Sequence, residues 1–117
     1  MSYVDGFVVP VPRDRVAEYE KIARDAAAVW LEHGALSVTE CVADDVSKGE
    51  VTSFPRAVQA SDDETVVFSW IAWPSRTVRD QGMKKVMEDP RMKTDPSSMP
   101  FDGKRMIYGG FEAILEV

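Results

Sequence analysis

The chain has 117 residues, of which 44% are hydrophobic and 29% charged, as expected of one soluble globular domain. Its 20 acidic and 14 basic residues give a net charge of −6, and no run of Lys or Arg supplies the basic face that nucleic-acid binding requires. No apolar run is long enough to span a membrane, no leader pattern opens the chain, and the single cysteine, Cys41, cannot form an internal disulfide. We therefore expect a single cytoplasmic domain over residues 1–117 that binds neither nucleic acid nor membranes.

The first third of the chain predicts two strands around one helix. Tyr3–Val9 is short, apolar and aromatic, and two prolines follow it closely, which is typical of a strand. Apolar residues then recur at steps of three and four from Val16 to Trp30, so this segment predicts an amphipathic helix with Trp30 buried against the sheet. Gly34 supplies a left-handed helix end, and Leu36–Val42 predicts the second strand.

The remaining chain predicts two further strands and a second helix. Phe54–Ala60 reads as a possible edge strand, because Pro55 cannot donate a ladder hydrogen bond. Thr65–Ile71 is rich in β-branched and aromatic residues and predicts a central strand. Ser75 can cap a helix that ends at Glu88, and Met106–Leu115 predicts the last strand.

This order of elements predicts an α+β fold of the ferredoxin-like βαββαβ type, with an antiparallel sheet and both helices on one face. The other face then lacks a cover. Alternation along the first and last strands assigns these residues to it: Tyr3, Asp5, Phe7, Val9, Met106, Tyr108, Gly110, Glu112 and Ile114. Because so apolar a face calls for a partner, we expect a homodimer with a cleft between two facing sheets.

Five residues are candidates for a site in this cleft. Asp5 and Glu112 are carboxylates beside apolar surface, where a raised pKa would let them act as acid or base. The alternative is that basic neighbours pair with them structurally. Phe7, Trp70 and Tyr108 could stack on a flat ligand, or could be ordinary core or interface aromatics.

The remaining reactive residues point to structure rather than to chemistry. His33, the only histidine, falls in the last turn of the first predicted helix, where the helix dipole favours an imidazolium, and no clustered ligands suggest a metal site. Cys41 lies within a predicted strand and reads as a small buried thiol. Asp102–Arg105 lacks the glycines and the Ser/Thr of a phosphate-binding loop and reads as a turn. We expect neither a metal nor a cofactor.

The chain resembles the YbaA-like family of small bacterial proteins, a family of unknown function. The resemblance runs from Tyr3 to Glu116 and is carried by five segments: Tyr3–Val9, Glu40–Cys41, Val66–Ile71, Asp89–Met92 and Met99–Glu112. It implies a dimeric α/β-barrel fold, whose superfamily includes cofactor-independent monooxygenases, lactone isomerases, haem-binding enzymes and plain ligand binders. The fold therefore narrows the function little, and the family supplies no catalytic residues to carry over.

Together these features lead to two functional hypotheses. The first is a dimer that binds a small apolar or aromatic molecule between its sheets, with cofactor-free oxygenation or isomerisation as the possible reaction and Asp5 or Glu112 moving a proton. The second is a non-enzymatic interaction module whose cleft is filled by its own side chains. The segment from Pro90 to Lys104 is expected to cross the subunit boundary or cover the cleft, because Met92, Met99 and Phe101 need burial.

Overall fold

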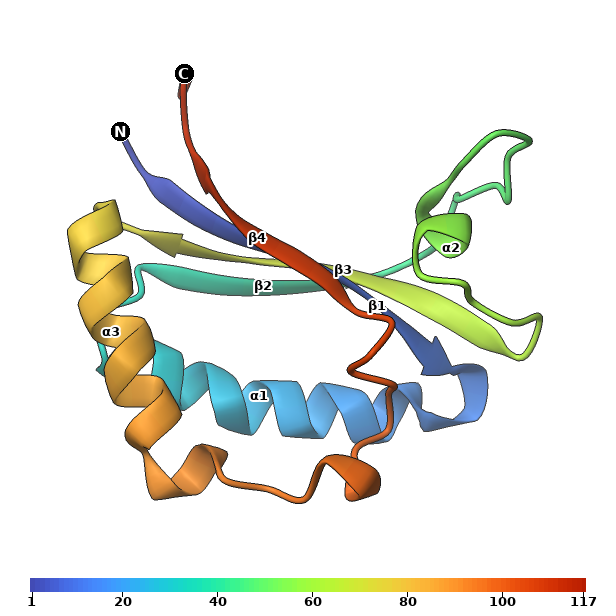
Figure 1. Cartoon of the computed structure of the whole chain (residues 1–117), viewed down its shortest axis with the longest axis horizontal. Coiled ribbons are helices and arrows are strands. Elements are labelled where there is room, and N and C mark those ends of the chain that lie inside the picture. Colours follow the sequence, from blue (N-terminus) through green and yellow to red (C-terminus); the bar gives the residue numbers. More distant parts are fainter.

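Four antiparallel strands form one sheet in the order β2-β3-β1-β4 in the computed structural model, which describes residues 1–117 (Figure 1). The strands are β1 (Tyr3–Pro12), β2 (Ser37–Val42), β3 (Glu64–Trp73) and β4 (Ile107–Glu112). β1 pairs with both β3 and β4, so the first and last strands of the chain are neighbours. The predicted sheet and its antiparallel pairing are confirmed.

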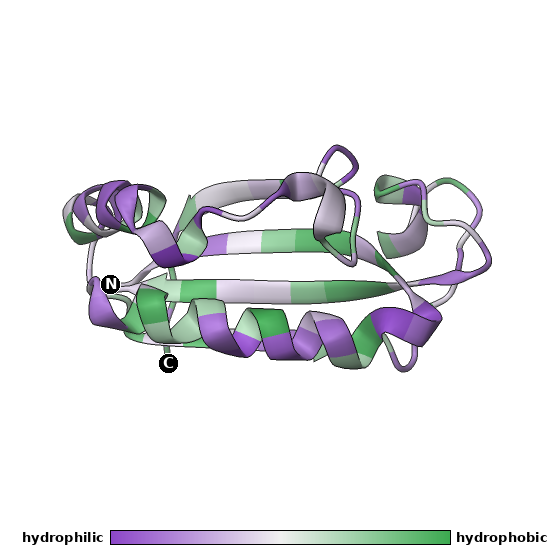
Figure 2. Ribbon diagram, turned by 90° about the horizontal axis from the view of Figure 1, so that it is seen from below, coloured by the Kyte–Doolittle hydropathy of each residue, from purple (hydrophilic) through white to green (hydrophobic).

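Two helices, α1 (Val16–Glu32) and α3 (Arg76–Glu88), cover one face of this sheet (Figure 1). Apolar residues recur in bands along α1 among polar ones, as its amphipathic spacing requires (Figure 2). The Ser75 hydroxyl caps α3 by accepting a hydrogen bond from the Val78 amide at 3.2 Å, as predicted. Neither helix has the length and apolar character that crossing a bilayer demands.

The main core lies between these helices and the sheet. The Trp30 ring meets Trp73 edge-on, with ring centroids 6.0 Å apart, and both side chains are buried, which confirms the predicted helix face. Gly82 of α3 lies against the same ring. A Cβ atom at Gly82 would stand 2.5 Å from Trp73 and 2.5 Å from the carbonyl oxygen of His33, so only glycine fits this contact.

The segment predicted as an edge strand, Phe54–Ala60, is not a strand. It begins with a short helix, α2 (Phe54–Ala57), because Pro55 suits the first helical turn and the Ser53 hydroxyl accepts a hydrogen bond from the Arg56 amide at 3.1 Å. Val58 then packs on Val8 and Val66, away from α1 and α3. The segment therefore covers one end of the sheet face that the long helices leave free.

The 90–104 segment contains two 3₁₀ turns, η2 (Pro90–Met92) and η3 (Pro96–Ser98), and a third, η1 (Arg13–Arg15), follows β1. The segment runs beside α1, on the helix side of the sheet (Figure 1). Met92 packs against the main core, and the Phe101 ring meets Tyr19 of α1 with centroids 5.7 Å apart. The segment therefore does not cover the sheet face that the long helices leave free, where the cleft was expected, and its crossing of a subunit boundary stays a prediction.

The predicted assignment of faces along β1 and β4 is reversed. Tyr3 and Phe7 pack against the main core, and Val9 packs with Val67 and Tyr19, so this set of β1 faces the helices. The opposite set, including Val8, faces the free side with Val58. Alternation could not decide between the two because both sets are apolar, and Val8 and Val9 are both buried.

Candidate functional site

The sheet face opposite α1 and α3, called the open face below, is largely apolar. Its cross-strand rows follow from the strand register, in which Gly6 lies between Trp70 and Gly109, and Val8 lies between Phe68 and Ile107. Its solvent-exposed members are Ser37, Cys41, Phe68, Ile107 and Phe111, of which only Ser37 is polar. The open face is therefore apolar, as expected, although different residues form it, and its burial against a partner stays a prediction.

A hollow of about 240 Å³ lies on the open face where Gly6 and Gly109 pair directly. Its walls are the side chains of Phe68, Ile107 and Phe111. A Cβ atom at Gly109 would lie 3.6 Å from the Phe111 ring, which is ordinary contact. The two glycines thus form the floor of this space, and a larger side chain there would fill it.

A second hollow of about 220 Å³ adjoins the first along β3, and Phe68 lines both. Phe54 of α2 meets Phe68 edge-on with centroids 5.8 Å apart, and Phe68 lies 5.5 Å from the Trp70 ring. The exposed thiol of Cys41 belongs to this hollow, so the expectation of a buried thiol is wrong. Each hollow is smaller than the roughly 300 Å³ at which small-molecule sites usually start.

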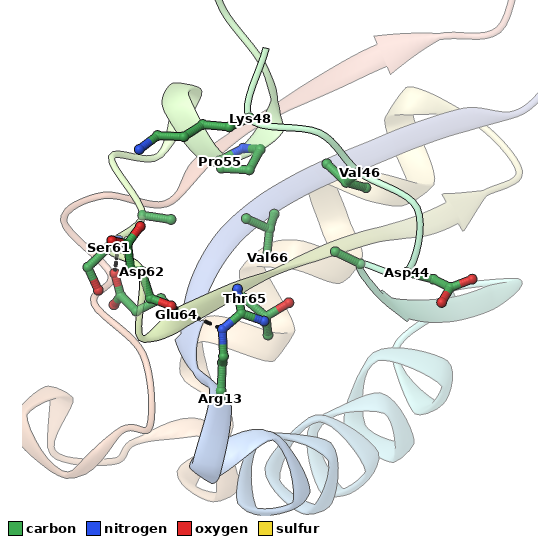
Figure 3. A pocket seen from close by; sticks show the side chains of 12 residues that line it. Arg13, Asp44, Val46, Lys48, Pro55, Ser61, Asp62, Glu64, Thr65 and Val66 are labelled. Atoms are coloured by element: carbon green, nitrogen blue, oxygen red, sulfur yellow. Dashed lines mark hydrogen bonds between the residues drawn. The ribbon is translucent and has the colours of Figure 1, made fainter.

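A third, polar cavity of about 390 Å³ lies at the end of β1 and the start of β3 (Figure 3). Arg13 and Lys48 enter it from opposite sides (Figure 3). The Arg13 Nε donates to the Asp62 carbonyl oxygen at 3.1 Å, and neither Arg13 nor Lys48 forms an ion pair. Glu64 also lines the cavity, but it is bonded to Arg105 at 2.8 Å, which lowers its pKa to about 2.

The two candidate carboxylates lie on the helix side rather than on the open face. Asp5 is buried, its Oδ2 accepts a hydrogen bond from the Trp73 indole at 2.9 Å, and its Oδ1 lies 3.5 Å from Nε of Arg79. Burial raises the pKa of Asp5, and the bond from Trp73 and the charge of Arg79 offset part of this rise. Glu112 lies opposite Tyr3 in the register and is exposed. Neither carboxylate can reach a ligand in the open-face hollows.

Among the three candidate ligand-binding aromatics, only Trp70 lies on the open face. Phe7 and Tyr108 stack on each other on the helix side, with centroids 6.4 Å apart. Tyr108 remains exposed there, at the edge of the sheet. Phe54, Phe68 and Phe111 line the hollows instead. Alternation assigned Phe111 to the wrong face, and Phe54 was missed because its segment was predicted to be a strand.

Two polar clusters on the helix side join residues far apart in the sequence. Tyr19 donates to Glu40 at 2.7 Å, and burial raises the pKa of Glu40. His33 lies 3.1 Å from an Asp89 oxygen, and with Glu32 these residues bring three ligand-type atoms within 4.8 Å of one another. The expectation that His33 lacks clustered partners is therefore wrong.

The Glu32–His33–Asp89 cluster is nevertheless explained by ion pairing. The guanidinium of Arg91 bonds to Asp89 at 2.7 Å and also to Glu32. These hydrogen bonds hold the pKa of Asp89 well below its usual range. Arg91 thus supplies the positive charge that a metal would otherwise bring, and the cluster joins the end of α1 to the turn after α3.

Fold and site together describe a small α+β protein with one helix-covered sheet face and one apolar open face. The same fold occurs in the crystal structure of an uncharacterized NIPSNAP domain protein from Burkholderia xenovorans, with a TM-score of 0.55, 13% identity, and coverage of 95% of this chain and 93% of that one. At this identity the likeness concerns the fold alone.

The family described as "Protein of unknown function (DUF1428)" matches residues 2–103, and the chain belongs to it. The chain is also 57% identical over 116 residues to the "Uncharacterized protein YbaA" of Escherichia coli K12 and to that of Shigella flexneri, covering 99% of both sequences in each comparison. The resemblance to YbaA-like proteins is thereby confirmed.

Proposed function

We propose that the protein is a homodimer that joins through its open face and binds a small apolar or aromatic molecule over the Gly6–Gly109 pair. The observation that carries this proposal is the glycine-floored hollow between Phe68, Ile107 and Phe111. Glycines keep this space open even when a second sheet lies over it. The second copy would complete a site that is too small in one protomer.

The proposal is one of binding and includes no reaction. No carboxyl or imidazole group lines the hollow at Gly6 and Gly109. Oxygenation or isomerisation through Asp5 or Glu112 is not part of the proposal, because both carboxylates lie on the opposite face of the sheet. Phe68 and Phe111 instead offer rings against which an apolar or aromatic molecule can pack. The cytoplasm remains the proposed compartment, since Cys41 is a free thiol.

The neutral dye Nile red tests the hollow through its fluorescence. We expect the wild type to bind it and Gly109→Val to lose most of this binding, because the valine side chain fills the space in front of Phe111. Gly103→Val is the matched control, since nothing lies within 4 Å of a Cβ atom at Gly103. Equal binding by the two variants would exclude this site. A dimer that binds no dye would favour the alternative, a non-enzymatic interaction module with a filled cleft.

A further inference from the structure

We infer that the ligand of the open face is an amphipathic monocarboxylate, with its acid group between Arg13 and Lys48 and its apolar tail along the two open-face hollows. This inference rests on the proposed function and specifies the ligand class. It follows from the continuity of three cavities and from the charges at one end of them.

The three cavities form one path. The polar cavity and the Phe54 hollow share four lining residues: Ala43, Asp44, Val46 and Val66. The Phe54 hollow and the glycine-floored hollow share Phe68. The path runs along β3 from Val66 to Phe68, about 7 Å, and across the sheet to Gly109 on β4, two strand spacings or about 10 Å away, so its diagonal is about 12 Å. An extended tail of about ten carbons has this length, given a C–C bond of about 1.5 Å.

Arg13 offers free donors at the polar end of this path. Six of the eight arginines form an ion pair with a carboxylate: Arg15, Arg24, Arg76, Arg79, Arg91 and Arg105. Arg13 instead bonds to the 61–64 turn, through its amide to Asp63 at 2.9 Å and its Nε to Asp62 at 3.1 Å. Both Nη groups therefore lack a partner in a place that the backbone fixes, and a carboxylate can accept from them.

Lys48 supplies the second cation. Its carbonyl oxygen accepts a hydrogen bond from Arg56 Nε at 2.8 Å, so the loop that carries it is held in place. The other charged lining residues are Asp44, Asp62 and Glu64, of which Glu64 is neutralised by Arg105. Figure 3 shows the Asp44 carboxylate turned away from Arg13 and Lys48. Because Glu64 is paired with Arg105 and Asp44 points away, Arg13 and Lys48 face Asp62 alone, and this excess of one positive charge suits a monocarboxylate rather than a polyanion.

Calorimetric titration with decanoate and with decanol distinguishes the contribution of the acid group to binding from that of the apolar tail. Both compounds are used below the concentrations at which they aggregate. We expect the wild type to bind decanoate at least tenfold more tightly than decanol. Arg13→Gln and Lys48→Gln should each weaken decanoate binding several-fold and leave decanol binding unchanged. Lys84→Gln, an exposed change on α3, is the control and should alter neither.

Equal affinity of the wild type for decanoate and decanol would overturn the inference and leave the proposed function standing. Decanoate binding that survives both Arg13→Gln and Lys48→Gln would also overturn it. If neither compound binds, the inference fails, and Nile red decides the proposed function separately. The two proposals can thus fail independently.

Discussion

Asp5 ties three elements together on the helix side of the sheet. One carboxylate oxygen accepts the indole N–H of Trp73 on β3, and the other faces Arg79 of α3. Arg79 also donates to the Tyr3 hydroxyl at 2.9 Å and lies 4.8 Å above the Tyr3 ring. Burying a charge costs free energy, so we infer that Asp5 stabilises the core through its hydrogen-bond acceptor rather than through its charge.

Substitution of Asp5 separates the acceptor from the charge. Asp5→Asn keeps an oxygen for the Trp73 indole and should change the free energy of unfolding by less than about 1 kcal/mol. Asp5→Leu leaves that buried N–H without an acceptor and should cost about 1–3 kcal/mol. Urea melts of the two variants measure the difference, and similar losses in both would show that the acceptor is not what matters.

The pKa of Asp5 also predicts how the stability depends on pH. Because burial raises this pKa in the folded state, the folded protein holds the proton more tightly, and stability falls as pH rises from just below the ordinary value of 3.8. Asp5→Asn removes this titration, so its stability relative to wild type should improve between pH 3.5 and pH 7. Urea melts at these two pH values test the sign, and a relative loss at pH 7 would contradict it.

At the scale of elements, α3 approaches the core through Gly82 rather than through a side chain. Gly82→Ala should destabilise the protein by about 1–3 kcal/mol, because the new methyl group would overlap the Trp73 ring and the His33 carbonyl oxygen. The better helix propensity of alanine offsets less than about 1 kcal/mol of this loss. Gln81→Ala, the exposed neighbour, is the control for propensity and should be near neutral. A neutral Gly82→Ala would mean that α3 can move away from Trp73.

The elements themselves were largely predictable from local sequence signals. The apolar spacing of α1, the Ser75 cap of α3 and the β-branched run of β3 are each fixed by residues close together in the chain. The strand prediction for Phe54–Ala60 was wrong because its aromatic and β-branched residues favour a strand, whereas Pro55 begins a helix there. The assignment of β1 residues to the two sheet faces was wrong for a different reason. Asp5 looked suited to an open cleft, but its partner Trp73 lies 68 residues away, and no local pattern shows that bond.

Contacts between residues far apart in the sequence also explain why most of the candidate site was not predicted. Trp70 lies on the open face, whereas Phe54 reaches that face from a helix that was predicted as a strand, and Phe111 from a strand whose two faces were interchanged in the prediction. The polar end of the path was also missed. Arg13 and Lys48 are 35 residues apart in the printed sequence and meet only across a cavity built by the 43–62 segment.

For the molecule as a whole, the open face is the surface that most needs a partner. Burying several hundred Å² of apolar surface on each of two copies, at about 25 cal/mol per Å², gives a gross gain above about 10 kcal/mol. Association costs about 4–15 kcal/mol, so the expected dimer is stable by a modest margin. One charge at the centre of the face should therefore be enough to dissociate it.

Two exposed aromatic residues of β4 provide a matched test of this dimer. Phe111, 64% exposed, belongs to the open face, and Tyr108, 71% exposed, belongs to the helix side. In sedimentation equilibrium at micromolar concentration, Phe111→Asp should be a monomer, because an aspartate in the interface would be buried without a partner. Tyr108→Asp should stay dimeric like the wild type, and both variants should keep the wild-type circular dichroism. A monomeric wild type would remove the shared cleft, and dissociation by Tyr108→Asp alone would place the interface on the helix side of the sheet.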